Sequence, residues 1–216
     1  MTRPFRGMIA LVIAIVVVSY FGFRSSYWDL FPQFSGTGWQ VHFHVATIIL
    51  WLAMLITQGW LAYKRRITEH KLIGRLSYIL VPLIILGFFL ITDYGQRRQK
   101  VPDLIGATIF DMGLFVLFYI MAIANRKRSA RHSIYMMLTP VAFINPTLGR
   151  VISPEVSLPV QLILLLTLFI VARVRRETWQ PYAVALLGYV MLLVLIIYIS
   201  FIQPSITTWI WDALWG

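Results

Sequence analysis

The chain has 216 residues, of which 59% are hydrophobic and only 12% are charged, and it contains no cysteine. Ordinary soluble domains carry about a quarter charged residues, so this composition excludes a water-soluble domain and indicates an integral membrane protein. The missing cysteines exclude disulfides, thiolate catalysis and cysteine-ligated metal centres. The net charge of +11 lies in short clusters between apolar runs, which membrane topology and anionic lipid explain better than a nucleic-acid partner.

Seven apolar runs reach or approach the roughly 20 residues that a helix needs to cross a bilayer. In chain order they are 7–23, 41–63, 72–92, 103–124, 133–150, 158–173 and 181–202, of which the sixth is the shortest. They predict an all-α bundle of about seven transmembrane helices. We expect one integral membrane domain over residues 1–216, because no connection between the runs is long enough to form a domain of its own.

The positions of Lys and Arg in the connections predict the orientation. One side receives fourteen of them: Arg3, Arg6, Lys64, Arg65, Arg66, Lys71, Arg75, Arg126, Lys127, Arg128, Arg131, Arg173, Arg175 and Arg176. The other side receives five: Arg24, Arg97, Arg98, Lys100 and Arg150. We therefore expect a cytoplasmic N-terminus and an outer C-terminus, as in a protein of a bacterial inner membrane. The tail TTWIWDALWG carries three tryptophans, which is typical of an interfacial belt.

A weak internal repeat joins KRRITEH at 64–70 to RKRSARH at 126–132. Each motif has three cations, three further residues and then a histidine, with a constant offset of 62 positions. The repeat favours two helical hairpins related by an axis along the membrane normal, forming a four-helix core over 41–150. The alternative is that two basic loops carry a histidine by chance.

His70 and His132 each open a predicted span on the cytoplasmic side. Two imidazoles that face each other at one membrane depth are the ligands of a bis-histidine b-type haem, and Arg75 and Arg131 suit the haem propionates. Another metal ion is an alternative, although two nitrogens alone make a poor zinc site. The plainer alternative is that both histidines contact lipid headgroups or cap their own helices.

At the other end of the second run, His42 and His44 point about 200° apart on a helix, so only one of them can face an interior metal or ligand. His44 is the better candidate, because Gln58 continues its stripe and polar stripes in membrane helices face the bundle. His44 and Gln58 lie about 21 Å apart along the helix, so His44 and His70 belong to opposite leaflets.

Asp111 is an acid within the fourth run. Acids inside membrane helices usually have a function, so Asp111 is a candidate functional residue. It can take up protons or bind a cation together with His44, but we favour a structural contact with Arg150. Asn145 belongs to the polar stretch TPVAFINPTLGR at 139–150. This stretch predicts either the wall of a cavity or a proline-broken helix packed on its neighbours.

The hairpin His44…Gln58…His70-Lys-Leu-Ile-Gly74-Arg75, followed by Arg131-His132…Met137…Arg150, resembles uncharacterised bacterial multi-span families. Those families carry a His…Gln…His-x-x-x-Gly-Arg hairpin and are loosely similar to transmembrane b-type cytochromes and related reductases. The resemblance covers roughly residues 41–150 and implies haem held between histidines of a four-helix core. A fourth inward histidine is missing, which argues against a two-haem path.

We therefore expect a redox-type membrane protein that binds b-type haem or another metal and exchanges electrons with quinone or a partner complex. Two alternatives remain open. The first is a non-catalytic membrane subunit or assembly factor of a larger complex, and the second is a small proton-linked transporter that uses Asp111 and His44. The sequence contains no P-loop, HExxH motif or nucleophile elbow, so nucleotide chemistry and hydrolysis have no support.

Overall fold

The computed structural model describes residues 3–99, 104–202, 205–206, 209 and 213. Its elements are α1 (Arg3–Gly22), η1 (Trp28–Leu30), α2 (Trp39–Tyr63), α3 (Ile67–Gly74), α4 (Ser77–Gln99), α5 (Leu104–Ala124), α6 (Ser129–Leu138), η2 (Pro140–Phe143), α7 (Ile144–Val151), α8 (Pro154–Val174), α9 (Gln180–Ile197) and η3 (Tyr198–Ile202). No strand occurs within these ranges, so the predicted all-α architecture is confirmed.

Four segments are long and apolar enough to cross a membrane: Trp39–Tyr63, Ile67–Gly95, Pro154–Val174 and Gln180–Ile197. Two shorter apolar helices, Ile9–Gly22 and Thr108–Ala124, and the broken α6–η2–α7 segment occupy the other three predicted runs. The outward faces are apolar as well, with Leu50, Ile79 and Met191 more than half exposed. A bundle that turns such side chains outward has the surface an integral membrane protein requires.

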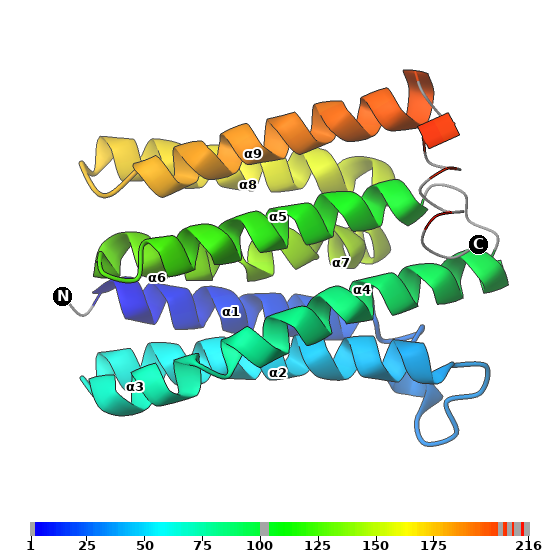
Figure 1. Ribbon diagram of the computed structural model, residues 1–216, viewed down its shortest axis with the longest axis horizontal. Coiled ribbons are helices and arrows are strands. Elements are labelled where there is room, and N and C mark those ends of the chain that lie inside the picture. The colour runs from blue at the N-terminus through cyan, green and yellow to red at the C-terminus, as the bar shows by residue number, and fades with distance from the viewer. Residues whose placement is uncertain (1–2, 100–103, 203–204, 207–208, 210–212, 214–216) are drawn as a thin grey trace.

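The helices lie side by side along one axis (Figure 1). α2 packs against α4, α5 packs against α6 and α9, and α8 packs against α7 and α9. The start of α1 and the α2–α3, α5–α6 and α8–α9 turns lie at one end of the bundle (Figure 1). The predicted cytoplasmic clusters of Lys and Arg therefore all gather at that end, called here the basic end.

α1 has a larger part in the core than the sequence pattern indicated. It packs against α2 on one side and against α6, η2 and α7 on the other, and it buries Val12 and Ile15. At Gly22 the missing Cβ would lie 3.0 Å from the Thr147 carbonyl oxygen, so only glycine permits this approach of α1 to α7. The predicted core of runs two to five is thus joined by the first run.

The fifth run breaks where its prolines predict. Pro140 has no N–H to donate to the Met136 carbonyl, so the helix gives way to η2 at this point. The freed carbonyl accepts a 2.7 Å hydrogen bond from the Thr139 hydroxyl. Pro146 lies in the first turn of α7, where backbone N–H groups have no partner within the helix. The Met136 carbonyl therefore keeps a hydrogen-bond partner despite Pro140, and Pro146 leaves no further carbonyl unpaired within its helix.

α2 and α8 end in the same way, with an arginine in the left-handed conformation. These residues are Arg65 (φ 59°) and Arg176 (φ 54°). In each case the N–H of the next residue, Arg66 or Glu177, donates 2.9 Å to the carbonyl five positions earlier, which is the Schellman arrangement. Glycine usually occupies this position, because a Cβ there costs roughly 1–2 kcal/mol.

Arg65→Gly and Arg176→Gly should each raise the free energy of unfolding by about 1 kcal/mol, because glycine relieves this backbone strain. The measurement is the thermal unfolding midpoint of the protein in mild detergent. Arg65→Ala is the matched control, since it removes the same charge but keeps the Cβ, and it should bring no gain. Equal stabilisation by Ala and Gly would contradict the backbone explanation.

Candidate functional site

The structure brings His70 and His132 together at the basic end. They lie at equivalent positions of α3 and α6, four residues after Arg66 and Arg128, whose carbonyls accept their backbone N–H at 3.0 Å. The two imidazole ring centres are 6.4 Å apart, and the ring planes are inclined by 80°. Two histidines separated by 62 positions in the sequence thus form one pair, as the repeat predicts if the hairpins face each other.

Hydrogen bonds determine which ring nitrogens of this pair are available. The Nδ1 of His70 lies 3.3 Å from the Gln58 carbonyl oxygen, and the Nδ1 of His132 lies 2.9 Å from the Ala122 carbonyl oxygen. A carbonyl can only accept, so each Nδ1 carries the hydrogen and each neutral ring has its lone pair on Nε2. A hydrogen bond from one ring nitrogen to a backbone carbonyl also orients histidines that bind metals through the other nitrogen.

The ring separation distinguishes between metal geometries. With metal–nitrogen bonds of roughly 2.0–2.1 Å, two imidazoles on opposite sides of one ion have ring centres about 6 Å apart, whereas a tetrahedral site needs a shorter separation. Among the described residues no group of three or more His, Cys, Asp or Glu side chains comes together. The pair therefore lacks, among the described residues, the further protein ligands of a closed zinc site.

Gln58 and Gly74 lie next to the histidine pair on α2 and α3. Gly74 follows His70 by one helical turn, and a Cβ there would lie 3.7 Å from the Gln58 amide nitrogen. Both polar atoms of the Gln58 side chain are buried and have no hydrogen-bond partner. The His-x-x-x-Gly spacing thus lets α3 lie close to a polar side chain of α2 that has unused hydrogen-bonding capacity.

The two arginines assigned to haem propionates differ in their surroundings. Arg75 is exposed at the end of α3, whereas Arg131 is half-buried. Arg131 lines a hollow of about 650 Å³ together with Lys127 and Arg128 of the α5–α6 turn and Arg176 of the α8–α9 turn. Four cations and one acid, Glu177, therefore line a hollow between these two turns, and His132 is not part of its lining.

His42 and His44 point to different environments, as their spacing predicts. Burial raises the pKa of Tyr27, so its hydroxyl stays protonated and hydrogen-bonds to the His42 Nδ1 at 2.9 Å. His42 also packs edge-on against Phe34, which gives it a role in holding the loop before α2. His44 instead faces the bundle, where its buried Nδ1 has no hydrogen-bond partner, although the Gly87 backbone is close.

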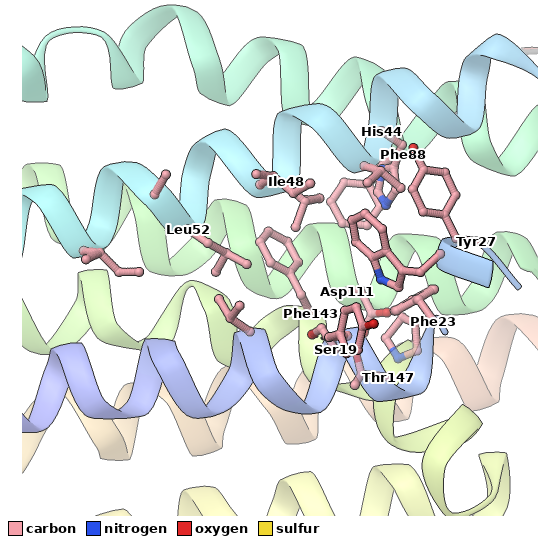
Figure 2. Close-up of a pocket in the computed structure, with 18 residues that line it drawn as sticks. Ser19, Phe23, Tyr27, His44, Ile48, Leu52, Phe88, Asp111, Phe143 and Thr147 are labelled. Atoms are coloured by element: carbon pink, nitrogen blue, oxygen red, sulfur yellow. Dashed lines mark hydrogen bonds between the residues drawn. The ribbon is translucent and has the colours of Figure 1, made fainter. Parts of the chain in front are cut away.

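His44 lines a cavity of about 490 Å³ at the end opposite the basic turns. Side chains from α1, α2, α4, α5, η2 and α7 and from the loop after α1 form its wall (Figure 2). In Figure 2, His44 and Phe88 project into the cavity from one side and Ser19 and Thr147 from the other. The stretch 139–150 contributes Phe143, Pro146 and Thr147, so it is both a cavity wall and a broken helix.

Asp111 also lines this cavity, and the expected ion pair with Arg150 is wrong. Only 4% of Asp111 is exposed, and its Oδ1 accepts a 3.1 Å hydrogen bond from the Asn145 amide. The Arg150 guanidinium lies 4.4 Å from the Phe23 ring centre and donates to the Pro146 carbonyl. The ion pairs within the described residues are Arg24–Asp29 and Arg66–Glu69, so Asp111 has no cationic partner there.

Two polar members of the cavity wall, Ser19 and Trp28, were not predicted from the sequence. Ser19 lies 3.3 Å from Thr147 of the predicted polar stretch and joins α1 to α7, while the Trp28 ring nitrogen is buried without a partner. Ser19 and Tyr20 are the only hydroxyl-bearing residues of the run 7–23. This polar position in an apolar run could have indicated that Ser19 faces the interior. Trp28 offered no such indication, because aromatic residues are common in any interfacial loop.

Comparison of the chain with models of protein families, with curated proteins and with solved structures found no match. The resemblance to b-type cytochromes therefore stays an expectation that rests on the short motifs around His44, His70 and His132.

Gly87→Ala should lower the free energy of unfolding by about 1–3 kcal/mol, because a Cβ would overpack the contact between α4 and α2. It would lie 3.3 Å from the Thr47 hydroxyl and 3.4 Å from both the Cα and the Nδ1 of His44. Gly149→Ala is the control, since its nearest neighbour would be at an ordinary 3.5 Å. Thermal unfolding measures both variants, and equal midpoints would refute a close approach at Gly87.

Proposed function

We propose that the chain is an integral membrane protein whose basic end faces the cytoplasm and binds a transition-metal centre, b-type haem above all, between His70 and His132. The single observation that carries this proposal is the facing pair of imidazoles. Their ring centres are 6.4 Å apart and each ring is held through its Nδ1. The function that follows is electron exchange with quinone or with a partner protein of the membrane.

The orientation is supported by where the cations gather. The start of α1 and three turns rich in Lys and Arg lie at one end of the bundle, which the positive-inside rule assigns to the cytoplasm. α1 begins at this end, which agrees with a cytoplasmic N-terminus. A bacterial inner membrane is the membrane that such an arrangement suits best.

The residues around the histidine pair fit a haem in their chemistry. His70 and His132 supply two imidazoles, and no hydrogen bond of the described residues uses either Nε2. Arg131, with Lys127 and Arg128 beside it, supplies positive charge for the propionates, and Arg75 supplies more from α3. A haem with this ligation contributes reversible one-electron transfer. The protein holds the ligands, orients them through backbone carbonyls and neutralises the carboxylates.

The chain lacks cysteine, which makes orientation directly testable. In intact bacterial cells, a membrane-impermeant thiol reagent should label Ser35→Cys, in the loop between α1 and α2, without permeabilisation. It should label Ser129→Cys, at the start of α6, only after permeabilisation. Both serines are exposed, and the unsubstituted chain is the control without thiols. The opposite labelling pattern would refute the orientation.

His70→Ala and His132→Ala should each abolish a b-type band in reduced-minus-oxidised spectra of the purified protein, because each removes one of two metal ligands. His42→Ala is the matched control, since His42 hydrogen-bonds to Tyr27 at the other end of the bundle and should leave the band unchanged. Elemental analysis for transition metals accompanies the spectra.

A flat spectrum and no transition metal in the folded protein would remove the metal-centre proposal. The two histidines would then stabilise the α2–α3 and α5–α6 turns through their carbonyl contacts. The alternative of a non-catalytic subunit would in that case be tested by co-purification with a larger membrane complex.

A further inference from the structure

The cavity lined by Asp111 and His44 does not include His70 or His132 and has a chemistry of its own. Its volume of about 490 Å³ falls within the range of small-molecule sites. Most of its wall is apolar, so it does not suit a strongly hydrated solute. The polar groups on the wall are few, and they decide which molecule the cavity can hold.

Asp111 is the dominant polar group of the cavity. It is almost completely buried, it forms one hydrogen bond with an uncharged amide, and no ion pair joins it to the described residues. A buried carboxylate without a cation is costly in an apolar surrounding. It is stabilised when a proton or a cationic ligand occupies the position opposite it. Intramembrane acids on a cavity wall are commonly used in this way.

Aromatic rings form much of the remaining wall. Six of the lining residues are aromatic: Tyr20, Phe23, Tyr27, Trp28, Phe88 and Phe143. The faces of such rings attract organic cations, and several rings around one site act together. The Phe23 ring centre lies 4.4 Å from the Arg150 guanidinium, so one of these rings already contacts a cationic side chain of the protein.

His44 and Trp28 add two polar groups to the wall. The His44 Nδ1 lies against the Gly87 backbone of α4, and the Trp28 ring nitrogen is buried without a hydrogen-bond partner. An ammonium or onium ion accepts no hydrogen bond, so only the aromatic rings of these residues bear on such an occupant. His44 stands across the cavity from Ser19 and Thr147 (Figure 2).

We propose that this cavity binds a lipophilic organic cation, an amine or a quaternary onium ion, with Asp111 as its counter-charge and the aromatic wall around its apolar groups. The observations combine one buried carboxyl group, the absence of an ion pair to it within the described residues, and six aromatic rings. With a neutral occupant the carboxyl group would keep its proton, so only a cationic occupant makes use of its charge. The proposal does not depend on a metal centre at His70 and His132.

Two ions of matched size test the charge selectivity directly. Tetraphenylphosphonium and tetraphenylborate carry the same four phenyl groups around a central positive or negative charge. Equilibrium binding of each radiolabelled ion to the purified wild-type protein in uncharged detergent should show saturable binding of the phosphonium only. Empty detergent micelles give the background partition of both ions. Equal binding of the two ions, or no binding of the phosphonium to folded protein, would overturn the proposal.

Asp111→Asn should weaken phosphonium binding at least tenfold, because it keeps the shape and the hydrogen-bonding capacity of the side chain but removes its charge. Glu155→Gln is the matched control: Glu155 is an exposed acid in the first turn of α8, outside the cavity, and its loss should leave the affinity unchanged. Wild-type affinity in Asp111→Asn would overturn the assigned counter-charge.

Phe143→Leu provides a second variant if Asp111→Asn does not fold. It keeps an apolar side chain at the cavity wall but removes one aromatic face, and it should weaken phosphonium binding severalfold. Gel filtration and thermal unfolding establish that each variant is folded before binding is measured. Unchanged phosphonium affinity in Phe143→Leu would argue against an aromatic site for a cation. With that result the cavity would be a general apolar pocket without selectivity for cations.

Discussion

The pairing of backbone carbonyls in an apolar surrounding is the constraint on which this structure depends. Apart from short interruptions, the described residues of the predicted runs are helical, as a bilayer would require, because an unpaired peptide group without water costs several kcal/mol. Where a helix is interrupted, a nearby side chain takes over the hydrogen bond. Thr139 bonds to the Met136 carbonyl, Gln161 of α8 to the Val141 carbonyl at 2.7 Å, and Ser77 to the Gly74 carbonyl at 2.6 Å. The interruptions are therefore ordered parts of the fold.

These interruptions separate two regions of different chemistry. The break between α3 and α4 lies beside the histidine pair, where carbonyls of α2 and α5 hold the two imidazoles. The break at η2 brings Phe143 to the cavity, and Asn145 in the first turn of α7 bonds to Asp111. Trp51 is fully buried on α2 and bonded to Thr139, and the cavity continues along α2 as far as Ile56.

Much of the fold and part of the candidate site follow from the sequence. Composition and the length of the apolar runs are enough to predict helices, because each run satisfies its own backbone and needs no distant partner. Helical spacing predicts that His42 and His44 diverge, and the repeat predicts that His70 and His132 are equivalent. The ion pair between Asp111 and Arg150 was wrong, because helical spacing says nothing about which neighbour a side chain meets. Phe23, from the end of α1, occupies the position over the Arg150 guanidinium.

The sequence by itself therefore determined the helices, their approximate ends and the gathering of cations on alternate connections, all of which are local properties of the chain. Only the tertiary structure decided that α1 enters the core, that Asp111 meets Asn145, and that Trp28 and Ser19 share a cavity with His44. These contacts depend on the order and rotation of the helices around one another. That arrangement follows from side-chain packing between segments distant in the chain, including the close approaches at Gly22 and Gly87.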